Sequence, residues 1–280
     1  MHPRVTGLRR ALAFTLVSLL CAAAATGSDK KGVAFGLPAG TADRSLAALK
    51  IDWYYNWTVR PSSKASASCF VPMYWGRSWQ LATLKHDLPQ RTPDLLVYNE
   101  PDRSTQANRT VDEVVREWPR LLGLADRISA PAAKPFDDWM RRFMQESRAR
   151  RLEIAFVPIH WYGGPDSRRF LRYVDRVHEL YGLPIWITEF AVTDWKAKKY
   201  GTPNRFTEDD VIHFIEEVLP ELERRDFVKR YAWLTAESSK ESLRPSSLIA
   251  SDGKLTRVGK AYASFVADGE DASPCLAFGA

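Results

Sequence analysis

The feature that most constrains the fold is a repeated alternation between residues 30 and 271. Short runs rich in β-branched and aromatic residues alternate there with longer amphipathic stretches, which is the pattern of repeated βα units. Eight strands are predicted, at residues 32–36, 51–57, 69–75, 94–100, 127–132, 153–160, 184–190 and 228–235. Eight parallel strands with covering helices close into a barrel more readily than they form an open sheet. We therefore expect an α/β protein consisting of a single (β/α)8 TIM-type barrel.

Three helices are well defined between the later strands, at residues 136–150, 167–181 and 207–224, where apolar residues recur at three-to-four spacing. Thr207 followed by Asp210 resembles a capping box, although Asp stands where Glu or Gln is usual. No Gly-rich phosphate-binding loop follows any predicted strand. This argues against a dinucleotide-binding sheet and a Walker-type nucleotide site, and we expect no cofactor.

The first 27 residues differ from the rest of the chain. Arg4, Arg9 and Arg10 precede an apolar run at residues 11–20 and a small-residue stretch at residues 22–25, the layout of a secretory signal peptide. A membrane anchor is the alternative, but the apolar run is short for a bilayer span. Bulky Leu20 before Cys21 argues against a lipid anchor. We expect cleavage to leave residues 28–280 as one catalytic domain, secreted to the extracellular space or periplasm and free of the membrane.

Charge and cysteine content limit the partners further. The chain has 40 Lys and Arg against 34 Asp and Glu, a formal net charge of +6, but the two signs are mixed along the sequence. No basic block is present, so nucleic acid is not an expected partner. We also expect the protein to be a monomer. Without the leader, Cys69 and Cys275 remain. They either form one disulfide in an oxidising compartment or stay as one buried and one terminal thiol, and the sequence leaves both open.

Two acidic residues close apolar strands, at the face of the barrel where the βα loops gather and where functional groups are expected. These are Glu100 and Glu189. Burial of an isolated carboxylate costs several kcal/mol, so each position calls either for function or for a structural salt bridge to Lys or Arg. Two carboxylates facing each other across a barrel mouth can cleave a glycosidic bond between them. Retaining enzymes need carboxyls about 5–5.5 Å apart, whereas inverting enzymes need roughly 6.5–9.5 Å to admit a water.

Five sequence pieces, in order and each near a strand end, resemble glycoside hydrolase family 128, the endo-β-1,3-glucanases with catalytic glutamates on strands four and seven. The resemblance covers about residues 32–265. Its pieces are WYYNW at 53–57, FVPMYW at 70–75, NEPD at 99–102, HWY at 160–162 and WITEF at 186–190. It implies that Glu100 is the acid/base and Glu189 the nucleophile, in agreement with the reading from strand ends.

The resemblance also implies roles for residues beside the two acids. Asn99 would hydrogen-bond the sugar 2-hydroxyl, with a local turn cap as its alternative. His160 would orient Glu189 or bind a sugar hydroxyl, with a satisfied core histidine as its alternative. Tyr162 is a plausible hydroxyl donor near the nucleophile, a role that Tyr98 or Tyr74 can also fill. Asp102 is expected to cap the following helix, and no second His or Cys lies at zinc-ligand spacing.

Tryptophans matter because sugars stack their C–H faces on aromatic rings, although the same rings also fill cores. Five lie at or beyond predicted strand ends and are candidate sugar-binding residues: Trp57, Trp75, Trp161, Trp195 and Trp233. We expect about two of these five to be core residues. Trp118 and Trp139 lie in predicted helices and are expected to pack.

The sequence thus predicts a secreted retaining endo-β-1,3-glucanase that acts on β-1,3-glucan oligo- and polysaccharides. The β-1,3 linkage rests on the resemblance alone. One alternative is a glycanase for another β-linked polysaccharide, and another is a catalytically weak β-glucan-binding barrel. An exported esterase is disfavoured because the chain has no Gly-x-Ser-x-Gly elbow.

Overall fold

All eight predicted strands are present and parallel in the computed structural model, which describes residues 29–36, 39–63, 70–88, 92–235 and 240–267. The strands are β1 (Lys31–Phe35), β2 (Trp53–Tyr55), β3 (Met73–Tyr74), β4 (Thr92–Asn99), β5 (Ala125–Ala132), β6 (Val157–Gly163), β7 (Ile185–Val192) and β8 (Val228–Thr235). They pair in the orders β2-β1-β8-β7-β6 and β3-β4-β5.

The two sets of strands are joined at both seams by single parallel bridges. Tyr54 of β2 pairs with Phe70, just before β3, and Ser129 of β5 pairs with Phe156, just before β6. Backbone hydrogen bonds support both seams: Val71 N donates to Tyr54 O (2.9 Å), and Ala130 N donates to Phe156 O (2.8 Å). Each strand therefore has a neighbour on both sides, and the fold is the expected (β/α)8 barrel.

The barrel interior is filled by side chains that alternate with outward-facing ones along each strand. Its buried cluster consists of Ala34, Trp53, Tyr55, Val71, Met73, Leu96, Phe156, Trp186 and Ala232. Large rings fit because small residues face them: a Cβ added to Gly32 would lie only 2.4 Å from Trp53 Nε1. Phe156 and Trp186 stack with ring centroids 4.0 Å apart. The interior is thus a packed core, with room for substrate only at its ends.

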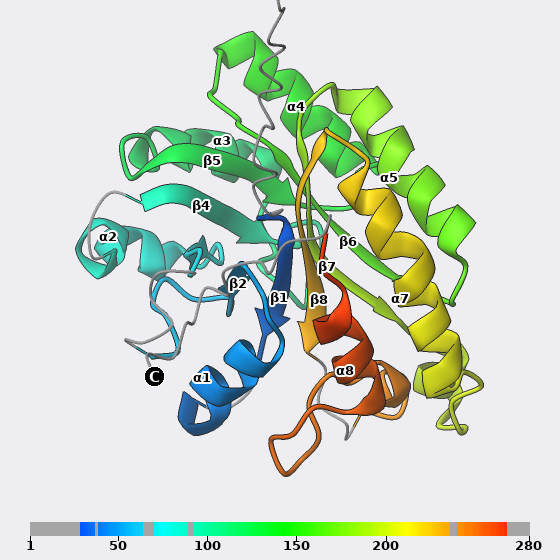
Figure 1. Ribbon diagram of the computed structural model, residues 1–280. Coiled ribbons are helices and arrows are strands. Elements are labelled where there is room, and N and C mark those ends of the chain that lie inside the picture. Colours follow the sequence, from blue (N-terminus) through cyan, green and yellow to red (C-terminus); the bar gives the residue numbers. More distant parts are fainter. Residues whose placement is uncertain (1–28, 37–38, 64–69, 89–91, 236–239, 268–280) are drawn as a thin grey trace, which may run out of the picture.

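Helices cover the outside of the strands (Figure 1). They are α1 (Ala39–Ala48), α2 (Ser78–Asp87), α3 (Val111–Glu117), α4 (Asp138–Arg150), α5 (Ser167–Tyr181), α6 (Trp195–Tyr200), α7 (Glu208–Glu223) and α8 (Arg257–Ser264), with short 3-10 turns at Trp118–Arg120 and Arg244–Ser246. The capping box predicted before α7 is confirmed, because Asp210 N donates to Thr207 Oγ1 and Thr207 N donates to Asp210 Oδ2. No helix occurs among the described residues between β2 and β3.

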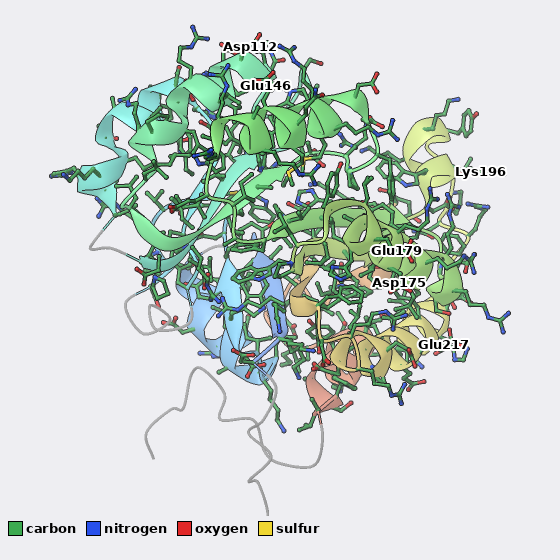
Figure 2. All side chains as sticks on the ribbon, turned by 90° about the horizontal axis from the view of Figure 1, so that it is seen from above. Asp112, Glu146, Asp175, Glu179, Lys196 and Glu217 are labelled. Carbon is green, nitrogen blue, oxygen red and sulfur yellow. The ribbon has the colours of Figure 1, made fainter. Side chains whose placement is uncertain are left out.

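The outer face of the helices carries mixed charge. Figure 2 labels Asp112, Glu146, Asp175 and Glu217 there, and each forms a salt bridge with an Arg or His. Across the described ranges, no helix is both long enough and apolar enough to span a bilayer. The predicted leader at residues 1–27 and the cysteines Cys21, Cys69 and Cys275 lie outside the described residues.

Candidate active site

The carboxylate of Glu189, on β7, lies among hydrogen-bond donors from aromatic side chains. Trp57 Nε1 donates to its Oε1 at 2.8 Å, and Tyr55 Oη donates to the same oxygen at 3.0 Å. Tyr162 Oη donates to Oε2. Within the described part of the chain, no Lys or Arg forms a salt bridge with Glu189. Its surroundings therefore differ from the structural ion pair that was the alternative explanation for a buried strand-end acid.

Glu100 follows the last residue of β4, and its side chain is 11% exposed. Arg103 Nη1 donates to its Oε2 at 3.1 Å. The Arg103 side chain is 41% exposed, so this ion pair lies at the surface of the mouth and leaves the Glu100 carboxyl accessible. Glu100 also lines a cavity of about 120 Å³ at the mouth.

His160, on β6, links the two acids. Its Nδ1 lies 3.2 Å from Glu100 Oε1 and 3.4 Å from Glu189 Oε2. Because both distances are measured from the same atom, the distance between Glu100 Oε1 and Glu189 Oε2 cannot exceed the sum of the two. That upper limit lies at the lower end of the spacing of inverting enzymes, roughly 6.5–9.5 Å. Glu100 and Glu189 therefore lie close together at the barrel mouth, in contact with the same histidine.

The same contacts determine where protons reside. Burial lowers the pKa of His160, but the charge of Glu189 and the contact with Glu100 outweigh burial and raise it above the ordinary 6.5. Burial raises the pKa of Glu100, but the hydrogen bonds and charges of His160 and Arg103 outweigh burial and bring it below the ordinary 4.5. These opposite shifts favour His160 over Glu100 as the holder of an exchangeable proton, one hydrogen bond away from Glu100.

The two tyrosines beside Glu189 remain protonated donors. Burial, followed by the charge of Glu189, raises the pKa of both Tyr55 and Tyr162 well above the ordinary value of 10.0. A neutral hydroxyl can only stabilise the Glu189 carboxylate by donating to it. Both hydroxyls therefore stay available as hydrogen-bond donors to the Glu189 carboxyl group.

The backbone at the mouth adopts conformations that non-glycine residues rarely take. Trp57 has a φ of 59° and Glu100 a φ of 42°. Such residues cost about 1–3 kcal/mol each and cluster at functional sites. Both turn the chain sharply at a strand end, and both place a side chain at the carboxylate pair.

Several predicted sugar-binding residues lie at this mouth. Trp195 is 44% exposed, lines the cavity with Glu100, and its Nε1 donates to Tyr162 O at 2.7 Å. Trp75 is partly buried and packs on the barrel interior, with Arg77 4.8 Å from its ring centroid. Asn99 is buried: its Nδ2 donates to Gln106 Oε1 at 3.3 Å, and its Oδ1 has no partner among the described residues.

Two of the five candidate tryptophans do not lie at the catalytic mouth. Trp161 alternates with His160 along β6 and points outward, where it packs on Phe170 and Tyr173 of α5. Trp233 is fully buried, and its Nε1 donates to Ser246 O at 2.9 Å. These two are packing residues and not substrate contacts, in line with the expectation that about two of the five belong to the core. The two-residue period of a strand directs both side chains to the helix layer.

Other expectations change in detail. Asp102 does not cap a helix, since α3 begins at Val111 with Thr110 as its cap. Sequence reasoning did not assign Tyr55 and Arg103 to the site, although Tyr55 falls within the WYYNW piece, two residues before Trp57. No cluster of His, Cys, Asp and Glu suited to a metal occurs among the described residues.

Comparison with known proteins gives consistent results. Residues 32–262 match the family model described as glycosyl hydrolase catalytic core. An endo-β-1,3-glucanase of family 128 subgroup I from Amycolatopsis mediterranei, solved with laminaritriose, is 31% identical with a TM-score of 0.71, covering 85% of this chain and 99% of that one. A curdlan-specific exo-β-1,3-glucanase of subgroup III from Blastomyces gilchristii, solved with glucose, is 27% identical with a TM-score of 0.66, covering 85% and 99%.

A curated relative is considerably longer. The alkali-sensitive linkage protein 1 of Schizosaccharomyces pombe is 28% identical over 258 residues, which are 85% of this chain but only 45% of that protein. The chain therefore spans less than half the length of this relative.

In this barrel, glutamates at the ends of the fourth and seventh strands both contact His160, and the fold and this site together define a glycoside hydrolase domain. Within that class, the chain belongs to the glycosyl hydrolase catalytic core family, and to glycoside hydrolase family 128.

Proposed function

We propose that the protein is a secreted retaining endo-β-1,3-glucanase. The observation that carries the proposal is the position of His160 Nδ1, 3.2 Å from Glu100 and 3.4 Å from Glu189, which limits the carboxylates to a short separation. The laminari-oligosaccharide complex of the Amycolatopsis enzyme supports the β-1,3 linkage. The charged and apolar pattern of residues 4–25 supports export.

In the first step, a Glu189 carboxylate oxygen forms a bond to the anomeric carbon as the glycosidic C–O bond breaks. Glu100 gives its proton to the leaving oxygen. That proton is available within the site, because transfer from His160 Nδ1 to Glu100 leaves a neutral imidazole and needs no proton from solvent. Tyr55, Trp57 and Tyr162 hold the Glu189 carboxylate in place.

In the second step, Glu100 is ionised and takes a proton from water. The water oxygen attacks the anomeric carbon, and the bond to Glu189 breaks. Two inversions give a product with the β configuration of the substrate.

The test is a side-by-side digestion of laminarin, curdlan, lichenan and carboxymethylcellulose, with products followed by chromatography and the first-formed anomer identified by NMR. We expect oligosaccharides from laminarin and curdlan, formed first as β-anomers. Release of glucose alone would replace endo with exo action. α-Anomers would exclude retention, and hydrolysis of the cellulose derivative alone would exclude the linkage. Binding of laminarin without turnover would favour a glucan-binding barrel.

The pH dependence of kcat/KM follows from the proton held by His160. Since the pKa of His160 lies above 6.5, the basic limb of the wild-type pH profile should lie above pH 6.5. Activity should be retained at lower pH and should fall as pH rises through this limb. In His160→Gln, the proton must reside on Glu100, whose ordinary pKa is 4.5, so the basic limb should move to lower pH. Kinetics on laminari-oligosaccharides across pH measure this shift.

The matched control is Tyr173→Phe, which removes a hydrogen bond to the backbone oxygen of His160 without removing a titrating group at the carboxylates. Its pH limbs should match those of the wild type. An unchanged basic limb in His160→Gln would show that His160 does not hold the catalytic proton.

A further inference from the structure

Asp102 is a buried acid that the fold does not explain. Its side chain is 6% exposed, and neither carboxylate oxygen has a hydrogen-bond partner among the described residues. The nearest cation is Lys134, whose Nζ lies 3.9 Å from Oδ2 and donates to Asp137 at 3.1 Å instead. A buried carboxylate without hydrogen bonds is costly, and a structural role as a helix cap is excluded because α3 begins at Val111.

The cavity that Asp102 lines indicates what it serves. This cavity of about 120 Å³ is bounded by Glu100, Asp102, Arg103, Lys134, His160 and Trp195, among others. Of the residues around the nucleophile, Tyr162 lines this cavity, whereas Glu189, Tyr55 and Trp57 do not. The cavity therefore lies on the Glu100 side of the carboxylate pair. In a retaining glycosidase, the acid/base residue stands beside the leaving oxygen, so the sugar on this side is the leaving group.

We infer that Asp102 is a specificity-determining residue that binds the leaving-group sugar, with its two free carboxylate oxygens accepting hydrogen bonds from sugar hydroxyls. The inference rests on the proposed glucanase function, and it extends that function to a subsite. Pro101 separates Glu100 from Asp102, and the positive φ of Glu100 turns the chain so that both acids line one cavity. Lys134, at the same wall, is placed to donate to an oxygen of this sugar.

The test compares substrates with and without a leaving-group sugar. Asp102→Ala should lower kcat/KM for laminaritetraose by roughly 10- to 100-fold, the loss expected for hydrogen bonds to a charged group. For 2,4-dinitrophenyl β-laminaribioside, whose leaving group has no sugar hydroxyls, kcat/KM should stay within about twofold of wild type. Asp102→Asn, which keeps the shape of the side chain, should give the same split with a smaller loss.

Asp137→Ala is the matched control, because it removes the carboxylate that Lys134 does contact and leaves the cavity wall intact. In this variant, kcat/KM for laminaritetraose and for the dinitrophenyl substrate should change by the same factor. Equal losses on both substrates in the folded Asp102→Asn variant, or no loss on either, would overturn the role of Asp102. Wild-type protein that cleaves neither substrate would instead overturn the proposed function. These outcomes are distinct.

Discussion

Glu189→Gln is expected to lower kcat/KM for laminarin on the order of 10⁴- to 10⁶-fold, the largest effect predicted for this protein. Glutamine cannot form the covalent bond to the anomeric carbon. The protein should still fold, since the amide oxygen can accept from Tyr55 and Trp57 while its nitrogen donates to the Tyr162 hydroxyl. Laminaritetraose should therefore still bind, which calorimetry can measure beside the kinetics.

The control is Glu217→Gln, which changes an exposed acid on the outer face of α7 (Figure 2) and should leave kcat/KM unaltered. A second variant, Glu189→Ala, opens space at the nucleophile. Azide entering that space should attack the anomeric carbon once, so an α-glycosyl azide is the expected product. A β-glycosyl azide would assign Glu189 the acid/base role, and near-normal activity in Glu189→Gln would remove it from catalysis.

The two acids could be found from sequence because the signal is local and physical. A glutamate that ends a run such as LLVYN or IWIT stands out, since few charged residues close an apolar strand without a partner or a function. Parallel βα units then bring all such strand ends to one rim. The long amphipathic segments were equally clear: the helix predicted at residues 167–181 has the same bounds as α5 (Ser167–Tyr181).

What failed depended on strand register and on tertiary contacts. The sixth strand was predicted at residues 153–160 but runs from Val157 to Gly163, and β3 contains only Met73 and Tyr74. Propensity identifies an apolar run, while backbone pairing decides its ends. Trp161 follows His160 directly, and only the strand period sends the two side chains to opposite faces.

The sequence also did not predict which charged side chains contact Glu100 and Glu189. Arg103 lies three residues after Glu100 in a loop, and no helical or strand period predicts that it contacts Glu100. The position of His160 between the two acids depends on a register shift between β6 and β7 that places it beside Glu189. These contacts lower the pKa of Glu100 and raise that of His160, shifts that no sequence pattern indicates.

Glu100→Ala is expected to show an effect that depends on the leaving group. For laminari-oligosaccharides, kcat/KM should fall roughly 10³-fold, because a sugar oxygen leaves poorly without a proton donor. For 2,4-dinitrophenyl β-laminaribioside, the first step needs no acid and should proceed. The second step loses its base, so a burst of dinitrophenol followed by slow turnover is expected, which stopped-flow absorbance measures.

Azide separates this role from that of Glu189. As an anion that needs no base, azide should attack the accumulated glycosyl-enzyme from the face opposite Glu189, giving a β-glycosyl azide and restoring turnover. Arg103→Ala serves as the control, because it removes the ion pair to Glu100 but keeps the acid, and should show neither the burst nor azide rescue. If Glu100→Ala loses activity equally on both substrates and azide changes neither rate, the assignment of Glu100 as acid/base is wrong.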